Sequence, residues 1–276
     1  MEIGPSIRRY PLATFLLLAF GLTWLVWVPR AMASQGLLAT DLPIVVGQAW
    51  SWGPAAAALL AAAITGGRAA VRELGARLVR WRVGWPWYVV VLIGPAAFSV
   101  AVAGAYAALG GSWVAPRAFE GNILGLVPFF LVLALTDGLG EEAGWRGYAL
   151  PRLLARHGAL AASLSLGLVW ALWHLPLLWT EGAVLYQRPV WLPFLELPAE
   201  AVIYTWIFQH TRGSALLAVL LHASSNLFAL PQAAAGDLGL SLLGAAAVWL
   251  LALVVVATFG TRRFARGPRP EAVSPA

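Results

Sequence analysis

The stretch GLGEEAGWRGYAL, residues 138–150, places two acidic residues and one arginine directly after an apolar run. That run, residues 123–136, is typical of a membrane-spanning helix. We therefore expect Asp137, Glu141 and Glu142 to lie at or just inside a membrane boundary. Ionisable side chains are costly in that environment, and by default they mark a functional site.

The two glutamates of this stretch have different surroundings on a helix. Glu142 and Arg146 are four residues apart and share a face, so they can form an ion pair. Glu141 is rotated by about 100° from Glu142 and has no basic residue three or four positions further along. The pattern predicts that Arg146 holds Glu142 in place, while Glu141 stays free to do chemistry.

The composition of the whole chain is that of a membrane protein. Of its 276 residues 61% are hydrophobic and only 11% are charged, which lies outside the range of soluble globular domains. The absence of cysteine excludes disulfides, thiolate metal sites and cysteine nucleophiles. All basic residues are arginines in the gaps between hydrophobic runs, so the net charge of +6 indicates membrane topology and lipid headgroups as partners, and no nucleic acid.

Eight hydrophobic runs are long enough to span a bilayer, which predicts an all-α polytopic membrane protein. Of the 18 basic residues, all but Arg30, Arg117 and Arg188 fall on one side when the gaps are counted alternately. This asymmetry favours a multi-pass protein of the cell membrane with both termini in the cytoplasm. The expected runs are residues 11–29, 44–65, 86–109, 122–141, 160–179, 190–209, 213–231 and 239–260.

Two segments near the N-terminus allow other interpretations. The first run could be a secretory signal ending near Ala33, but its apolar core is long and Arg30 precedes the cleavage-like residues, which favours a retained helix. Residues 66–85 carry arginines among apolar residues at helical spacing. They predict a basic amphipathic helix lying on the inner leaflet.

Two of the four histidines fall within predicted spans. His174 lies in the fifth run, just before the helix-breaking Pro176, and His222 lies in the seventh run with Asn226 one turn further on the same face. A lone histidine in a helix is usually a satisfied core residue, but two in separate spans together with an unpaired glutamate form a constellation. The other two, His157 and His210, fall in gaps, where we expect solvent.

These residue types fit a hydrolase in two ways. Glu141 and His174 can share a water and remove its proton, while His222 and Asn226 can stabilise the oxyanion that forms during attack on an amide. Alternatively Glu141, His174 and His222 can supply ligands to a divalent ion such as zinc, with a position left for water. The sequence leaves both readings open.

The sequence lacks the patterns of three other intramembrane hydrolases. It has no His-Glu-x-x-His zinc motif and no Gly-x-Ser-x-Gly serine elbow. An aspartyl dyad would need a second embedded aspartate beside Asp137, whereas Asp237 falls in a predicted outer loop.

Two acids on the sixth span complicate this interpretation. Glu196 and Glu200 are four residues apart on one helical face, where like charges repel. They can bond to a neighbouring helix, line a water path, or carry protons. A proton-coupled transporter that uses Asp137, Glu141, Glu196 and Glu200 as a relay is therefore the alternative from another functional class.

Three motifs in order resemble the signature of the CPBP intramembrane protease family. They are Glu141-Glu142-x-x-x-Arg146, Trp170-x-x-x-His174 and His222-x-x-x-Asn226, within about residues 120–230. The family includes the type II CAAX prenyl endopeptidases and bacteriocin-processing, bacteriocin-immunity and lysostaphin-resistance-like proteins. Trp170 stands where the family usually has phenylalanine, a departure that bears on the shape of the pocket.

The resemblance implies a role for each matching residue. Glu141 would activate water with His174, Glu142 and Arg146 would order the site, and His222 with Asn226 would stabilise the oxyanion. Both metal-dependent and glutamate-dependent members have been described, so the resemblance does not decide the cofactor.

The resemblance also implies an architecture and a substrate. It implies a protease core at about 120–230 with the site in a cavity among spans four to seven. Because no linker is long enough to separate domains, we expect a single membrane domain, residues 1–265, and the proline-rich, polar composition of 266–276 predicts a disordered tail. The implied substrate is a membrane-associated or prenylated protein or peptide. A non-catalytic immunity protein that retains the motifs is the remaining alternative.

Overall fold

The computed structural model describes residues 9–39, 50–119, 122–230 and 237–265, and within them the chain is helical without strands. Each of the eight predicted runs corresponds to a helix or a series of helices, which confirms the predicted fold class. The predicted tail at 266–276 and the beginning of the second run lie outside the described residues. The helices are α2 (Pro11–Ser34), α4 (Gly53–Leu78), α5 (Trp85–Ala108), α6 (Ile123–Leu133), α7 (Leu139–Gly144), α8 (Leu150–Leu154), α9 (Ala159–Trp173), α10 (Leu192–His210), α11 (Ala215–Leu227) and α13 (Leu238–Phe259).

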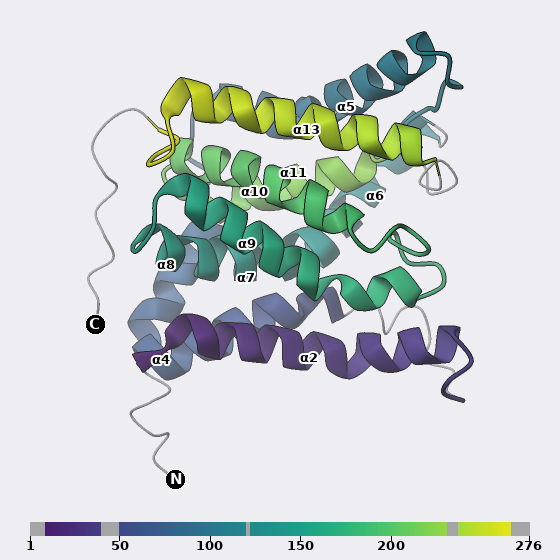
Figure 1. The fold of residues 1–276 in the computed structure, drawn as a ribbon. Helices are drawn as coiled ribbons and strands as arrows, with labels where there is room; N and C mark the ends of the chain where they lie inside the picture. Colours follow the sequence, from purple (N-terminus) through teal and green to yellow (C-terminus); the bar gives the residue numbers. More distant parts are fainter. Residues whose placement is uncertain (1–8, 40–49, 120–121, 231–236, 266–276) are drawn as a thin grey trace.

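The long helices run roughly side by side in layers (Figure 1). One layer holds α2 and α4, the opposite layer holds α5 and α13, and α7, α9, α10 and α11 lie between them. Six helical segments of the described chain are long and apolar enough to cross a membrane. The 13-residue α11 is apolar but shorter, and the 19-residue α10, which carries two glutamates, is not among the six. Both of these shorter or more polar helices lie in the central layer.

The fourth predicted run continues well past its expected end at residue 141. Helical structure extends from α6 through a π-helical turn at Ala134–Gly138, α7, a second π-helical turn at Trp145–Ala149, and α8. The apolar span was expected to end at residue 141 with Glu142 and Arg146 still on a helix, and the helix does continue, with the polar residues of this segment buried against other helices. Glu141 and Glu142 thus lie mid-helix, between two π turns of the kind often found at functional sites.

A basic helical segment follows the apolar part of α4, and it is shorter than the predicted residues 66–85. A break at Gly67, where φ is 60° and ψ is −152°, separates the two parts of α4, and the second part ends at Leu78. Only glycine adopts this backbone conformation readily. The remaining residues form the loop that leads to Trp85, the first residue of α5.

Glycines in the sequence GLGEEAG allow α7 to occupy the centre of the bundle. A Cβ on Gly140 would lie 2.8 Å from the carbonyl oxygen of Ser51, and a Cβ on Gly144 would lie 2.5 Å from the Cβ of Pro54. Small residues at helix contacts let backbones approach closely in membrane proteins. Gly140 and Gly144 therefore allow α7 to pack closely against Ser51 and Pro54, so that Glu141 and Glu142 are buried between helices.

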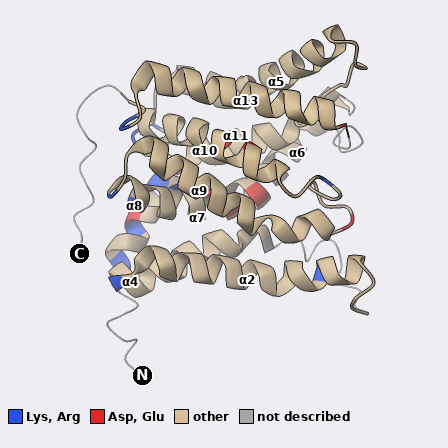
Figure 2. Cartoon of the chain, in the orientation of Figure 1, with Lys and Arg blue, Asp and Glu red and all other residues tan. Residues whose placement is uncertain are grey.

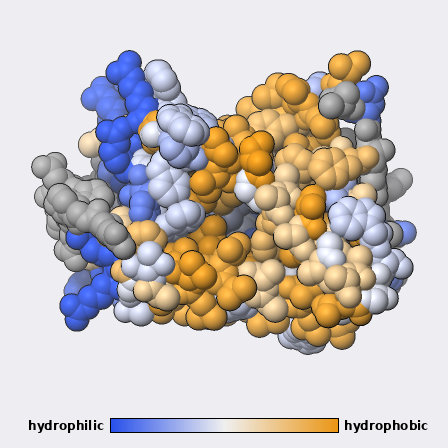
Figure 3. All heavy atoms as spheres, turned by 90° about the horizontal axis from the view of Figure 1, so that it is seen from above, coloured by the Kyte–Doolittle hydropathy of each residue, from blue (hydrophilic) through white to orange (hydrophobic). Residues whose placement is uncertain are grey.

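The surface divides into an apolar belt and a charged end. Arginines gather at the end of the bundle where α2 begins and α13 ends (Figure 2). Seen from the side of α5 and α13, hydrophilic residues gather at this same end, and hydrophobic residues cover most of the remaining face (Figure 3). On α6 alone, Leu124 is 81% exposed and Val127 67% exposed. This distribution is that of a multi-pass membrane protein.

Candidate active site

Glu141 lies on α7 within reach of two helices that are distant in sequence. Its carboxylate accepts a hydrogen bond of 2.7 Å from the indole nitrogen of Trp170 on α9. The Nε2 atom of His174 lies 3.9 Å from one carboxylate oxygen, and Nε2 of His222 lies 4.0 Å from the other. The side chain is buried, with only 4% of the residue exposed. The predicted meeting of Glu141, His174 and His222 is therefore present in the structure.

The two histidines direct their Nε2 atoms toward Glu141. Nδ1 of His174 lies 2.9 Å from the carbonyl oxygen of Trp170, and Nδ1 of His222 lies 2.9 Å from a carboxylate oxygen of Glu142. Because both partners are acceptors, each Nδ1 must carry the proton that it donates. His222 lies between the carboxylates of Glu142 and Glu141, which stabilise a second proton on its ring, so its Nε2 carries an N–H donor. In a neutral His174 the proton on Nδ1 leaves a lone pair on Nε2, so this atom and the Glu141 carboxylate are both acceptors. A water molecule, with two O–H donors, can bridge these two acceptors.

Glu142 holds two other site residues, Arg146 and His222, in place. It is fully buried, and its Oε1 atom accepts from Arg146 at 2.8 Å as well as from His222 at 2.9 Å. The pairing of Glu142 with Arg146 follows the i,i+4 spacing that the sequence predicts. The hydrogen bond to His222 was not anticipated, because it joins residues 80 positions apart.

Aromatic rings enclose the guanidinium of Arg146. Its central carbon lies 4.4 Å from the ring centroid of Trp170 and 3.9 Å from that of Tyr204 on α10. A cation over an aromatic face is stabilised by the ring quadrupole, and more strongly where water is excluded. Arg146 is 1% exposed, so its charge is buried against Glu142 and these two rings.

Asn226 does not bond to His222 in the way that their spacing on one helix suggests. Its amide nitrogen instead donates to a carboxylate oxygen of Asp137 at 3.3 Å. Asp137 lies in the π turn directly before α7, so this bond joins α11 to the glutamate-bearing segment. The sequence predicted that Asp137 lies within the membrane, but it did not indicate that Asp137 would bond to Asn226.

The alternative reading, in which Glu141, His174 and His222 hold a divalent ion, does not fit the distances between these side chains. Within the described residues, no three His, Asp or Glu side chains are placed to hold one ion. Zinc bonds of about 2.1 Å in a tetrahedron put neighbouring ligand atoms about 3.4 Å apart, which is closer than the 3.9 and 4.0 Å found between Glu141 and the two histidines. The geometry therefore favours a carboxylate and imidazoles around water, and we derive no chemistry through a metal.

The remaining histidines lie elsewhere. His157 is exposed in the turn after α8. His210, which we expected in solvent, is half-buried, with its ring centroid 5.0 Å from that of Trp87 and 4.9 Å from that of Phe259. That expectation was wrong because the end of α10 packs against aromatic side chains of α5 and α13, which cover the imidazole of His210.

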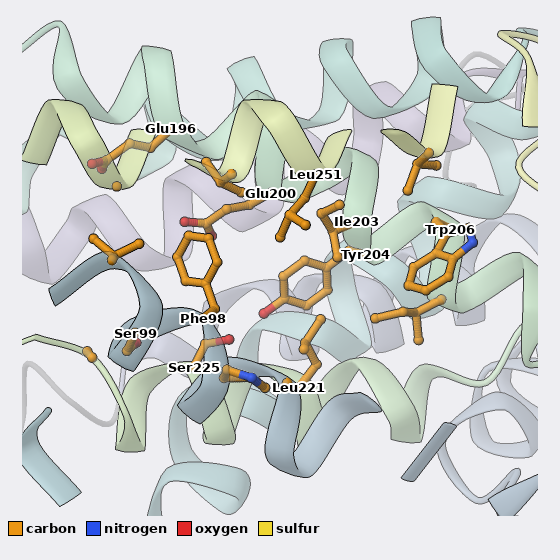
Figure 4. Close-up of a pocket in the computed structure, with 18 of the residues that line it drawn as sticks. Phe98, Ser99, Glu196, Glu200, Ile203, Tyr204, Trp206, Leu221, Ser225 and Leu251 are labelled. Atoms are coloured by element: carbon orange, nitrogen blue, oxygen red, sulfur yellow. The ribbon is translucent and has the colours of Figure 1, made fainter. Parts of the chain in front are cut away.

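A cavity of about 550 Å³ lies on the other side of α10 and α11, where they face α5 and α13. Figure 4 shows Glu200, Tyr204 and Ser225 among its polar groups. Tyr204 thus separates the cavity from the guanidinium of Arg146. Glu141 and His174 do not line this space, so it is distinct from the cluster around Glu141.

The two acids of α10 have different surroundings. Glu196 forms an ion pair of 2.8 Å with Arg188, from the loop before α10. Glu200 faces the cavity. The repulsion expected between them is thereby reduced, since Arg188 compensates the first acid.

Comparison with known proteins agrees with this arrangement. Residues 123–228 match the family model described as Type II CAAX prenyl endopeptidase Rce1-like. The CAAX prenyl protease 2 of Methanococcus maripaludis is 36% identical over 107 residues, which cover 37% of this chain and 38% of that protein. The chain thus aligns with less than two fifths of the relative's length. The matched segment contains all three motifs, so the family resemblance expected from them is confirmed.

Proposed function

We propose that this chain, whose residues 123–228 carry the Rce1-like domain of the type II CAAX prenyl endopeptidases, is an intramembrane endopeptidase that hydrolyses a peptide bond with water activated by Glu141. The observation that carries the proposal is the convergence of the Glu141 carboxylate with Nε2 of His174 and Nε2 of His222, each within 4.0 Å of a carboxylate oxygen. The carboxylate and Nε2 of His174 are two acceptors that suit a water molecule about to lose a proton, while the N–H of His222 is a donor for the oxyanion.

In the first step, the water oxygen bonds to the carbonyl carbon of the scissile amide, and its proton passes to Glu141. His174 orients the water through its Nε2 lone pair. In the second step, the carbon–nitrogen bond breaks, and Glu141 returns the proton to the leaving amine. The carboxylate therefore ends the cycle in its starting form, with a carboxylic acid and an amine as products.

His222 and Asn226 are the groups that we assign to the oxyanion. His222 is held by Glu142, and Asn226 by Asp137, so both side chains are oriented before substrate binds. Fixed donors cost no reorganisation when charge develops during the reaction. Glu142 and Arg146 position His222 and do not themselves contact the reacting atoms.

The substrate that we propose is a membrane-associated or prenylated protein or peptide. The relative's name, CAAX prenyl protease 2, and the apolar surface around the site support this class. An apolar tail can enter from the bilayer, while water reaches the glutamate from the arginine-rich end. We further propose that this end, with both termini, faces the cytoplasm, because arginines concentrate on that side of membrane proteins.

The alternative of a proton relay through the four embedded acids has less support. Asp137 bonds to Asn226, Glu196 pairs with Arg188, and Trp170 donates to Glu141. These contacts divide the acids between separate partners. A relay would require a chain of donors and acceptors linking them, and no such chain joins the four among the described residues.

The test is cleavage of a prenylated CAAX peptide by purified protein in liposomes, comparing the wild type with Glu141→Gln. The amide keeps the shape of the side chain but cannot accept the proton, so we expect the rate to fall by at least about 10²-fold. An unchanged unfolding temperature would show that the fold persists. Full cleavage by Glu141→Gln would exclude Glu141 as the base. No cleavage by the wild type would favour the transporter or the non-catalytic immunity protein.

A further inference from the structure

Three arginines line a hollow at the charged end of the bundle, away from the site around Glu141. Arg80 and Arg82 come from the loop between α4 and α5, and Arg212 comes from the loop between α10 and α11. The hollow has a volume of about 450 Å³, and its other walls include Val79 and Trp81. Both loops lie at the end of the bundle where Figure 2 shows the basic residues gathered.

These three arginines lack acidic partners among the described residues. By contrast, three arginines elsewhere in the described chain, Arg77, Arg146 and Arg188, each form an ion pair with a glutamate. No carboxylate oxygen of the described chain lies within 4.0 Å of the guanidinium groups that line the hollow. The hollow therefore concentrates positive charge that the protein does not itself compensate.

Hydrogen bonds hold the two loops and their guanidinium groups together. Arg80 donates to the carbonyl oxygen of Arg212, and Arg212 donates to the carbonyl oxygen of Arg82. The hydroxyl of Ser214 donates to the carbonyl oxygen of Arg80 at 2.7 Å. Since a guanidinium has five N–H donors, each arginine keeps several for a ligand. The guanidinium groups of Arg80 and Arg212 are thus positioned in advance for an anion with several acceptor oxygens.

The surroundings of the hollow indicate a lipid in preference to a soluble anion. Val79 is 70% exposed and Trp81 is 61% exposed, which suits an interface between headgroups and hydrocarbon. Helix α5 begins three residues after Arg82, and its residues Trp85 and Ile93 are 75% and 58% exposed. An apolar strip thus leads from the cationic hollow along the bilayer.

We propose that this hollow binds the phosphate headgroup of an anionic phospholipid, with an acyl chain lying along the exposed face of α5. Anionic lipid surfaces attract arginines at the cytoplasmic boundary, and the guanidinium fork matches the geometry of a phosphate. The site is separate from the peptidase chemistry and does not depend on it. It ties the loops after α4 and α10 to the leaflet.

The test is native mass spectrometry of the detergent-purified protein with equimolar phosphatidylglycerol and phosphatidylcholine. We expect the wild type to retain phosphatidylglycerol preferentially. Arg80→Gln/Arg82→Gln/Arg212→Gln should reduce this preference by about fivefold per arginine, on the order of 100-fold in all. The single variant Arg82→Glu leaves the hydrogen bonds between the loops in place, and it should reduce the preference even if the triple variant folds poorly.

The matched control is Arg68→Gln/Arg72→Gln/Arg156→Gln, which removes the same charge from exposed positions outside the hollow. This control should keep the preference. Equal losses in the two triple variants would overturn the proposal in favour of diffuse surface charge, and so would equal retention of both lipids by the wild type. Displacement of the lipid by millimolar inorganic phosphate would overturn it in favour of a soluble anion.

Discussion

Removing the charge of Glu142 tests the central electrostatic feature of the site. The substitution Glu142→Gln keeps the size of the side chain but leaves the guanidinium of Arg146 without a counter-charge. Both side chains are almost fully inaccessible, at 0% and 1% exposure, and 2.8 Å separates their charged atoms. Loss of one partner from a buried ion pair costs about 3–5 kcal/mol, because the other charge stays buried and unpaired.

A second pair on the same chain provides the control. Glu73 and Arg77 have the same i,i+4 spacing on α4, but the side chain of Glu73 is 37% exposed. Exposed pairs contribute about 0–1 kcal/mol, since water solvates whichever charge remains. We therefore expect Glu73→Gln to lower the stability far less than Glu142→Gln does, although both remove one negative charge four residues before an arginine.

The assay is thermal unfolding in detergent, followed by the intrinsic fluorescence of the 15 tryptophans. Two of them, Trp145 and Trp173, are fully buried near the site and report on its packing. At about 2–4 °C per kcal/mol, Glu142→Gln should lower the midpoint by roughly 6–20 °C. The double variant Glu142→Gln/Arg146→Met should recover much of this loss, because it removes both charges.

Similar midpoints for Glu142→Gln and Glu73→Gln would refute the reasoning, because burial would then make no difference to the pair. A double variant less stable than Glu142→Gln would also contradict it. That result would mean that the contacts of Arg146 with the rings of Trp170 and Tyr204 stabilise the protein more than its ion pair does.

Three further predictions concern the site and its support. His174→Ala should lower the cleavage rate by about 10²- to 10⁴-fold, whereas the exposed His157→Ala should leave it unchanged, and equal effects would mean that the wrong histidine has been assigned. Gly144→Val, whose Cβ would lie 2.5 Å from the Cβ of Pro54, should cost about 1–3 kcal/mol in thermal unfolding. Gly21→Ala, with no atom within 4 Å of its Cβ, should cost nothing, and a fully stable Gly144→Val would disprove the close packing. Incubation with a chelator should leave cleavage unchanged, and a loss of activity that zinc restores would show that the histidines bind an ion.

Local sequence patterns were sufficient to predict several features of this protein. Apolar runs of about 20 residues have few structural options in a bilayer, because backbone groups must satisfy one another within a helix, and this determined the all-α class. The i,i+4 spacing of Glu142 and Arg146 likewise determined their pairing, since it follows from helix geometry alone. The motif order indicated the family over the segment that it covers.

Other features depend on helix packing, which no local pattern encodes. The hydrogen bonds from Trp170 to Glu141 and from His222 to Glu142 join residues 29 and 80 positions apart. The placement of Tyr204 against Arg146 had no sequence signal at all. The sequence predicted that Glu142 and Arg146 lie on one helix, but it did not indicate which groups on other helices would bury the polar residues of this segment.

The sequence by itself therefore determined which segments are helical, that they suit a membrane, and which polar side chains are too costly to be there without a function. Only the tertiary structure decided which partners those side chains meet. The physical reason is that helix formation depends on neighbours within four residues, whereas a buried charge is stabilised by whatever group lies nearest in space, and here those groups come from α9, α10 and α11.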